Sequence, residues 1–465
     1  MHPVAAENVS ASESKGVSLT IYNQNFGLVK DIREVKLNEG GNFLRFEDVA
    51  AKIDPTSVSF LSLTAPNSVT VREQNYQYDL LDPDSILSKS IGKNVKFTQF
   101  LPGRTVHELS GTLLNAPLST VVQPNGVEST RYHGLVVKTA NGVVLNPSGQ
   151  VELAELPSGL ISKPSLLWRL DCDKAGTHKS EITYQTGGMN WNCDYVAIIN
   201  EDDTKTDLTS WVTLSNQSGA SFKNAALKLI AGDVHRVQPQ AYHMAASEGA
   251  FAAKAPQFQE QSFAEYHLYS LKEKTDVNNN ETKQLSLFNA ADVPTKKRFV
   301  FEPTQGVYVP YSGYLDRDKV HVKLEFDNNE ENHLGMPWPK GKVRVYKRDK
   351  DAALQFIGED EIDHTPRDEK VRLYIGDAFD VVGERKQTNM RQINDHVRRE
   401  SYEISLRNHK DSAITVTAVE HTYGPWKIVS SDLPYVKKDS RTFEFSANIP
   451  AKGQQTIAYE IELKN

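Results

Sequence analysis

The sequence lacks an apolar run long enough to cross a membrane as a helix, and it lacks an excess of basic side chains. No stretch approaches the roughly 18 consecutive apolar residues that a membrane-spanning helix needs. The 465 residues include 53 basic and 60 acidic side chains, which leaves a net charge of −7. We therefore expect no transmembrane segment and no basic patch for nucleic acid or anionic lipid.

Cysteine is also scarce, with only Cys172 and Cys193 in the chain. Two cysteines are too few for a thiolate zinc site, but they allow one disulfide, which export would favour. If residues 166–200 form a simple antiparallel meander, Cys193 lies opposite the start of the first strand. Cys172 then lies at the far end of that strand, about 20 Å away and out of disulfide reach. The sequence leaves the disulfide open.

Standard catalytic motifs are missing as well. The nucleophile elbow G-x-S-x-G, the P-loop, the G-x-G-x-x-G fingerprint and the zinc-protease pair H-E-x-x-H do not occur. The segment "GMPWPKGK" resembles a P-loop only loosely, because its glycine spacing is one residue too long and no Ser or Thr follows the lysine. We expect no organic cofactor.

Helical periodicity is rare, and the alternation typical of strands dominates. Apolar residues occupy every second position in "SLTIYNQ", "HVKLEF", "KVRVYKR" and "YEISLRN". Turn signals such as "NEGG", "TANG" and "NPSG" recur at short spacing, which favours antiparallel sandwiches or small barrels. One short helix is expected in "PDSILSKSIG", with Asp84 or Ser85 as its N-cap. The predicted class is all-β, with multidomain antiparallel β-sandwiches and a small β-barrel-like insertion.

The length of the chain predicts several domains. Composition and turn signals divide it into a flexible N-terminal tail (1–16), an N-terminal β unit (17–82), the small β-barrel-like insertion (83–160), a first β-sandwich region (161–300) and a C-terminal β-sandwich (301–465).

A short run, "TYQTGGMNWNCDYV", combines glycines, aromatic residues and a cysteine. Gly187 and Gly188 interrupt a strand pair and indicate a bend, because glycine adopts conformations that a Cβ forbids. Trp191 and Tyr195, with Trp211 on the next strand, are expected to cover the sheet. The cysteine has no neighbouring base or cation to activate it as a nucleophile. We interpret the run as structural.

The densest polar segment is "GEDEIDHTPRDE". Asp360, Glu361 and Asp363 are candidate calcium ligands, since Ca²⁺ takes six to eight oxygen atoms. Asp363, His364 and Arg367 are candidates for acid–base chemistry. The structural alternative is a proline-containing turn between two strands whose charges are solvated or paired.

Exposed aromatic rings are candidates for binding carbohydrate, because the apolar face of a sugar packs on an aromatic plane. Trp338, Trp426 and Tyr311 are the residues that we single out. In a β protein with 18 tyrosines and five tryptophans most rings are packed, so burial is the alternative for each.

Residues 165–465 resemble the domain of unknown function 4139 family, whose members include mucoidy inhibitor A-like proteins. The resemblance lies in "TYQTGGMNWNCDYV", "DLTSWVTLSNQSGASFKNAALKLIAGDVHRV", "GEDEIDHTPRDEKVRLYIGDAFDVVGERKQT" and "SYEISLRNHK". It implies a β-rich exported or envelope protein of bacteria, and the family name hints at a polysaccharide. The coiled-coil insertion of longer relatives is absent, the family pattern includes neither cysteine, and Met189 replaces a usual leucine.

The start of the chain, "MHPVAAENVSASESKG", reads as the mature N-terminus of an exported protein whose signal peptide has been removed. We expect a periplasmic or extracellular protein that binds polysaccharide or another envelope component, or that has a structural role, without catalysis. The alternative is a hydrolase, assisted by a metal ion, that uses Asp363, His364 and nearby carboxylates. The sequence does not predict the oligomeric state.

Overall fold

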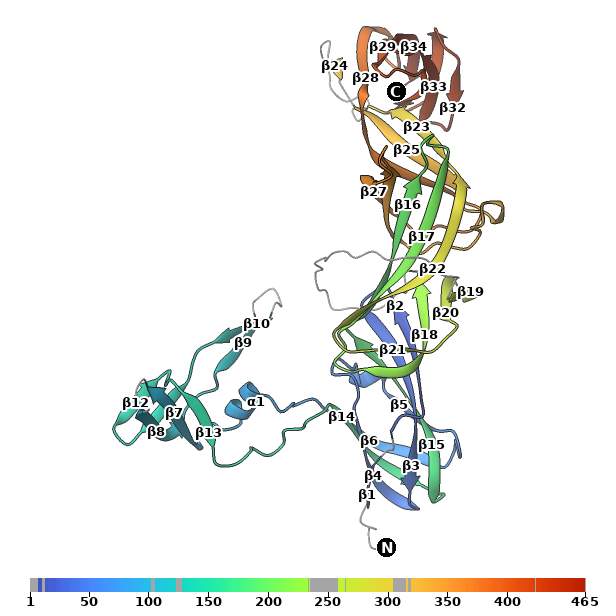
Figure 1. Cartoon of the computed structure of the whole chain (residues 1–465). Coiled ribbons are helices and arrows are strands. Elements are labelled where there is room, and N and C mark those ends of the chain that lie inside the picture. The colour runs from blue at the N-terminus through green and yellow to red at the C-terminus, as the bar shows by residue number, and fades with distance from the viewer. Residues whose placement is uncertain are drawn as a thin grey trace.

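The fold is built almost wholly from β-strands. The computed structural model describes residues 7–10, 13–101, 105–122, 128–232, 234, 258–263, 265–303, 315–316, 319–422 and 424–464. Strands account for 66% of the structure and helices for 3%, which confirms the predicted all-β class. The sheets stack into a column, and a module formed by residues 94–153 stands to one side of it (Figure 1).

Two sheets form the part of the column nearest the N-terminus (Figure 1). The first has the order β1 (Glu7–Ser10), β4 (Gly40–Glu47), β14 (Ser165–Cys172) and β6 (Val69–Gln77). The second has the order β19 (Phe258–Phe263), β20 (Tyr266–Leu271), β18 (Phe222–Ala231), β2 (Gly16–Tyr22), β3 (Phe26–Leu37), β15 (Gly176–Gly187) and β5 (Ser59–Ser62), and β21 (Thr275–Val277) pairs with β18. Segments before and after the insertion therefore share both sheets, so the division at residue 160 does not separate two sheets.

Two further sheets form the rest of the column. One has the order β22 (Glu281–Pro294), β17 (Lys205–Asn216), β16 (Met189–Ile199), β26 (Gly341–Arg348) and β27 (Leu354–Ile362). The other, called here the C-terminal sheet, has the order β31 (Trp426–Ser431), β34 (Gln454–Lys464), β29 (Val397–Asn408), β28 (Lys370–Asn394), β25 (Lys319–Asp327), β23 (Lys296–Phe301), β30 (Ile414–His421), β33 (Thr442–Ile449) and β32 (Tyr435–Lys437), and β24 (Leu315–Asp316) pairs with β28. Because β26 pairs in parallel with β16, the division at residue 300 is also crossed by a sheet.

The side module is an open sheet with the order β12 (Gly142–Leu145), β11 (Val136–Thr139), β8 (Thr105–Leu113), β7 (Asn94–Leu101) and β13 (Gln150–Leu153). A hairpin of β9 (Leu118–Val122) and β10 (Glu128–Tyr132) extends from it. In the described residues the edge strands β12 and β13 do not pair with each other, so the expected barrel-like insertion is an open sheet and not a closed barrel.

The helix α1 (Pro83–Ser88) precedes the module, and short 3-10 turns lie at Pro55–Ser57 and Glu330–Asn332. The N-cap of α1 is Asp82, whose carboxylate accepts the backbone N–H groups of Asp84 and Ser85. The sequence placed the cap at Asp84 or Ser85, inside the helix. Asp82 precedes Pro83, a residue favoured at the first helical position because it needs no N–H partner there. No helix of the described residues has the length and apolarity to span a bilayer.

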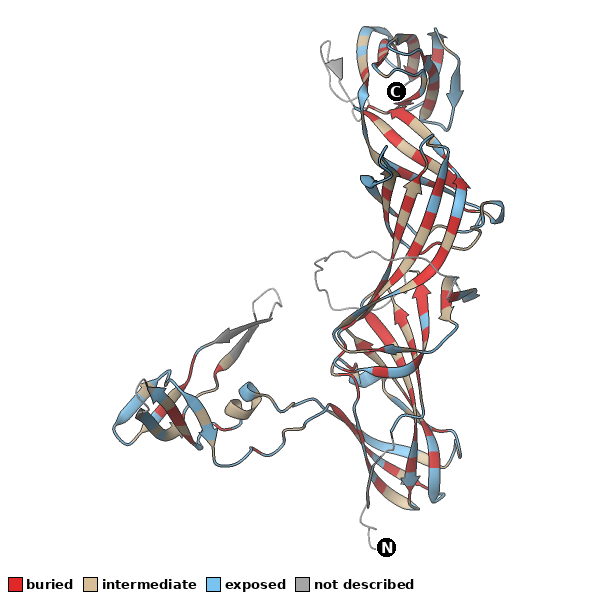
Figure 2. Cartoon of the chain, viewed as in Figure 1, coloured by how far each residue is buried: buried red, intermediate tan, exposed pale blue. Residues whose placement is uncertain are grey.

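The hydrophobic core follows this architecture. One continuous cluster runs through the two N-terminal sheets, the sheet of β16 and β17, and the adjoining ends of β25 and β28. A second cluster fills the C-terminal sheet, which folds over so that β30 and β33 face β29 and β34. A third, small cluster belongs to the side module alone. Buried and exposed residues alternate along the long strands, as the sequence pattern predicts (Figure 2).

The glycine-rich run lies where β15 passes into β16, which belong to different sheets. Gly188 has a φ of +79°, and a Cβ at this position would lie 2.6 Å from the carbonyl oxygen of Gln217. Gly187 precedes it at the end of β15 without such a contact. Glycine is therefore required at the second position of the bend.

The aromatic residues of this region lie on both faces of their strands. Trp191 is buried and meets the ring of Tyr269 edge-on, with the centroids 6.3 Å apart. Tyr195 is also buried, and its hydroxyl donates to the carbonyl oxygen of Pro339 at 2.6 Å. Trp211 lies on the opposite, partly exposed face of β17. The first two rings pack the core, whereas the third covers the outside of the sheet.

Candidate functional site

Trp338, a predicted carbohydrate-stacking residue, lies in the core. Its side chain is 1% exposed and stacks on Tyr195, with the ring centroids 5.2 Å apart and the planes 13° apart. Phe288 and Phe326 pack around it. A sugar cannot reach either face of this ring, so the prediction is corrected.

Trp426 is half-buried at the start of β31. Its indole N–H donates to the carbonyl oxygen of Ser440 at 2.8 Å, and its ring packs against Phe443 with centroids 4.9 Å apart. The ammonium of Lys437 lies 4.9 Å from the ring centroid. Protein groups thus already pack against this ring. Tyr311, the third candidate, lies outside the described residues.

The candidate catalytic residues of the acidic segment lie at the surface and do not form a site together. The Nδ1 atom of His364 accepts the backbone N–H of Lys340 at 3.1 Å, and its Nε2 lies 3.4 Å from the side-chain amide of Asn23. Asp363 is 94% exposed and lies 3.7 Å from the ammonium of Lys340. Arg367 pairs with Glu330 at 2.8 Å. The geometry gives no support to the alternative prediction of a hydrolase at this segment.

Each of the three candidate calcium ligands already has a protein partner, and Glu361 and Asp363 share the ammonium of Lys340. The carboxylate of Asp360 accepts the backbone N–H groups of Tyr374, at 2.7 Å, and Glu361, at 2.9 Å. The Glu361 carboxylate instead lies 3.8 Å from the ammonium of Lys340. Within the described residues no three His, Cys, Asp or Glu side chains form a group that could hold a metal ion. Calcium binding stays a prediction.

Both cysteines are free and buried, so the disulfide that the sequence left open is not formed. Cys172 is on β14 and Cys193 on β16, in different sheets. The Cys172 thiol donates to the carbonyl oxygen of Lys174 at 3.2 Å and lies 3.8 Å from Nε2 of His178. That nitrogen lies 2.8 Å from the same carbonyl. Burial raises the pKa of the Cys193 thiol, so the thiolate is suppressed there.

We expect the native protein to resist alkylation of its cysteines, because both thiols are buried and one is held in its protonated form. After unfolding without reductant, Cys172 and Cys193 are expected to take up one iodoacetamide group each, measured by intact mass. Unfolded protein that reacts only after a reductant is added would show that the two cysteines are bridged.

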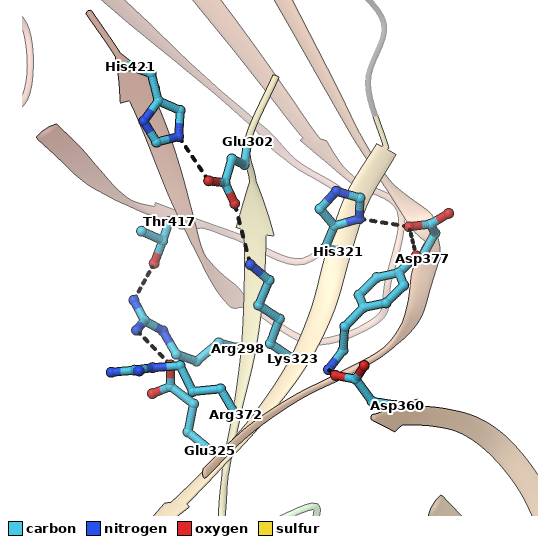
Figure 3. A network of polar contacts seen from close by, with 11 residues as sticks. Arg298, Glu302, His321, Lys323, Glu325, Asp360, Arg372, Asp377, Thr417 and His421 are labelled. Carbon is cyan, nitrogen blue, oxygen red and sulfur yellow. Dashed lines mark hydrogen bonds and ion pairs between the residues drawn. The ribbon is translucent and has the colours of Figure 1, made fainter. Parts of the chain in front are cut away.

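The outer face of the C-terminal sheet carries a network of paired charges (Figure 3). Around Asp377, the carboxylate receives the ammonium of Lys319 at 2.9 Å, Nδ1 of His321 at 2.8 Å and the hydroxyl of Tyr374 at 2.8 Å. These partners lie on β25 and β28, which are neighbours in the sheet. Hydrogen bonds from Lys319 and His321 lower the pKa of Asp377 to about 2.

A second part of the network joins β23, β25 and β30. His421 donates through Nε2 to Glu302 at 2.9 Å, and the other oxygen of Glu302 lies 3.3 Å from the ammonium of Lys323. Burial works to raise the pKa of Glu302, but the bonds from His421 and Lys323 outweigh it and lower that pKa. Arg298 pairs with Glu325 at 3.1 Å. Each of these carboxylates has a basic partner, so the face is suited to tying strands together.

The Asp377 pairing predicts a loss of stability in acid. Its folded pKa of about 2 lies below the ordinary value of 3.8, so the carboxylate contributes stability above that value and loses it as the pH falls toward 2. An Asp377→Asn variant is expected to melt below the wild type at neutral pH, and the gap should close in that acid range. Thermal melts followed by circular dichroism at several pH values measure this. If the difference in melting temperature between the two proteins stays constant as the pH falls toward 2, the assigned ion pair is contradicted.

A buried ionic cluster lies between the two halves of the folded C-terminal sheet. The guanidinium of Arg385 meets the carboxylate of Glu420 through Nε at 2.9 and 3.0 Å and through Nη2 at 2.9 Å. The hydroxyl of Tyr459 donates to the same carboxylate at 2.8 Å. Tyr402 donates to Glu400 at 2.6 Å, and Arg385 lies 3.9 Å from the centroid of the Tyr402 ring. Sequence reasoning missed this cluster.

The small volume beside this cluster limits which molecules it could bind. It lines a small cavity of about 10 Å³, which has room for the centre of one water molecule and is too small for a sugar ring. Burial raises the pKa values of Tyr402 and Tyr459, so both phenols remain protonated donors. The cluster is therefore suited to fixing the strands and not to holding a substrate.

No known protein family and no curated protein matches this chain. The resemblance of residues 165–465 to the domain of unknown function 4139 family therefore stays a prediction.

Proposed function

We propose that the chain is a non-enzymatic binding protein of the bacterial envelope, exported from the cytoplasm, in which the column of sheets acts as a scaffold for the side module. Polysaccharide is the partner that we favour. The family resemblance motivates the location, and the surface of the module motivates the binding role.

The observation that carries the proposal is the concentration of exposed apolar side chains on and beside the module. Nine of the 22 exposed large hydrophobic residues of the described chain lie between residues 78 and 156. Phe100 is 72% exposed and pairs across strands with Val106, which is 48% exposed. Contiguous exposed apolar side chains, such as this pair, mark binding surfaces on a folded protein. The module has its own small core, so these side chains are not needed to build it.

The test measures whether the full-length protein is retained on immobilised glycans and on immobilised envelope extracts, at several salt and calcium concentrations. Phe100→Ser is expected to weaken retention, whereas Phe379→Ser, which changes a 97% exposed ring on the column, should leave it unchanged. If the protein binds no glycan and no extract component under any of these conditions, the proposal is overturned.

A further inference from the structure

The outer face of the module's sheet has an open groove. Its volume is about 430 Å³, within the usual size of ligand sites. The groove spans β7, β8 and β11 and is lined by Asn94, Ser110, Gly111, Thr112, Lys138, Thr139 and Ala140. It lies on the side of the sheet away from the buried Val95 and Phe97.

Strand register sets the order of the groups along this groove. Asn94 is paired with Thr112, Thr112 with Lys138, and Lys138 with Val143, so one row crosses four adjacent strands. Cross-strand partners of this kind point to the same face of the sheet. The row therefore presents an amide, a hydroxyl and an ammonium in sequence, and it ends on the 57% exposed side chain of Val143.

The electrostatics of the groove favour an anion. Lys138 is exposed and makes no ion pair with any described residue, and no carboxylate lines the groove. The nearest basic neighbour along β7, Lys96, is already paired with Glu108 at 2.7 Å. An unpaired ammonium beside hydroxyl and amide donors can bind a carboxylate while the neighbouring groups bind sugar hydroxyls.

The charge balance of the whole chain points the same way. Residues 94–153 contain four basic and three acidic side chains, while the chain as a whole has a net charge of −7. An acidic polymer is therefore repelled less by the module than by the rest of the protein. A nucleic acid would need several basic side chains and stacked aromatic rings in the groove, which has one lysine and no aromatic ring.

We propose that this groove is a binding site for an acidic glycan, with Lys138 receiving a uronate carboxylate and Asn94, Ser110 and Thr112 bonding the sugar hydroxyls. The apolar face of a sugar ring would rest on Val143. The inference rests on the proposed binding function and adds to it the ligand class and the site.

The test is calorimetric titration of the full-length protein with a short galacturonate oligomer, with a neutral dextran oligomer as comparison. Galacturonate is expected to bind more tightly than dextran, and its binding should weaken as the salt concentration rises. Lys138→Gln should weaken galacturonate binding about tenfold, as expected for losing one hydrogen bond to a charged group. Thr112→Val tests a neutral contact. Lys179→Gln, which changes an exposed lysine of β15 on the column, is the matched control and should bind like the wild type.

The outcomes separate the two proposals. Galacturonate binding that Lys138→Gln and Thr112→Val leave unchanged, in variants with native circular dichroism, would overturn the site but not the binding function. Retention of neutral glycans or other envelope components without galacturonate binding would overturn the ligand class alone. If the protein retains neither these components nor galacturonate, both proposals fail.

Discussion

Replacing Glu420 with glutamine is expected to lower the free energy of unfolding of the C-terminal sheet by about 3–5 kcal/mol. The side chains of Arg385 and Glu420 are only 11% and 4% exposed, so little water is available to take over from a lost partner. The substitution keeps the shape of residue 420 but leaves the guanidinium charge buried without compensation. The hydroxyl of Tyr459 also loses its anionic acceptor.

The measurement is native-state hydrogen exchange of amides in β29, β30 and β34, because a chain with several sheets does not unfold in one transition. The double variant Arg385→Met, Glu420→Leu is the matched control. It removes both charges, and it should recover most of the loss, since an apolar pair of similar volume often replaces a buried ion pair without cost. If the single and double variants are equally unstable, the loss comes from packing and not from the unpaired charge.

The alternation of buried residues along β29 and β30 contains a sequence signal for this cluster. On β30, Val416, Ala418 and Glu420 follow one another at every second position and are all buried. On β29 the buried series Tyr402, Ile404 and Leu406 likewise extends back to a charged residue, Glu400. A charged side chain at an inward-facing position of a strand needs a buried partner. A charged residue at such a position therefore predicts a buried ionic cluster.

The strands were predictable from the same alternation, but their partners were not. Leu44 on β4 lies opposite Trp168 on β14, and the whole side module separates the two in sequence. The adjacent strands β14, β15 and β16, which looked like a meander, belong to three different sheets. Local patterning specifies that a strand is half-buried, whereas the choice of partner depends on contacts distant in sequence. The free state of the cysteines likewise could not be predicted from their spacing.

The exposure of the candidate residues was unpredictable for a related reason, since residue type does not determine burial. Trp338 and Trp426 look equivalent in sequence, yet the first is buried and the second is half-exposed. Acidic residues that are adjacent in the chain alternate between strand faces, so Asp360 and Glu361 turn to different partners. The groove on the side module was also missed, because its lining residues come from three strands and none belongs to a motif.

Trp338→Ala is expected to lower the stability of the middle of the column by about 3–5 kcal/mol, the range for deleting a buried tryptophan ring. The ring fills the space between Tyr195, Phe288 and Phe326, and its removal leaves a cavity that three rigid aromatic neighbours cannot close. Denaturant unfolding, followed by hydrogen exchange in β16 and β26, measures the loss.

Trp338→Phe is the matched variant for this position. The indole N–H of Trp338 has no hydrogen-bond partner in the described part of the chain, so phenylalanine keeps most of the apolar contact and removes a buried unpaired donor. Its cost should be well below that of alanine. Trp426→Ala, at a half-exposed ring, should also cost less. Because Trp338 reaches no ligand, glycan retention by the folded Trp338→Phe variant should equal that of the wild type. Lost retention in a variant of native stability would mean that the ring is exposed to a ligand and that this part of the column opens.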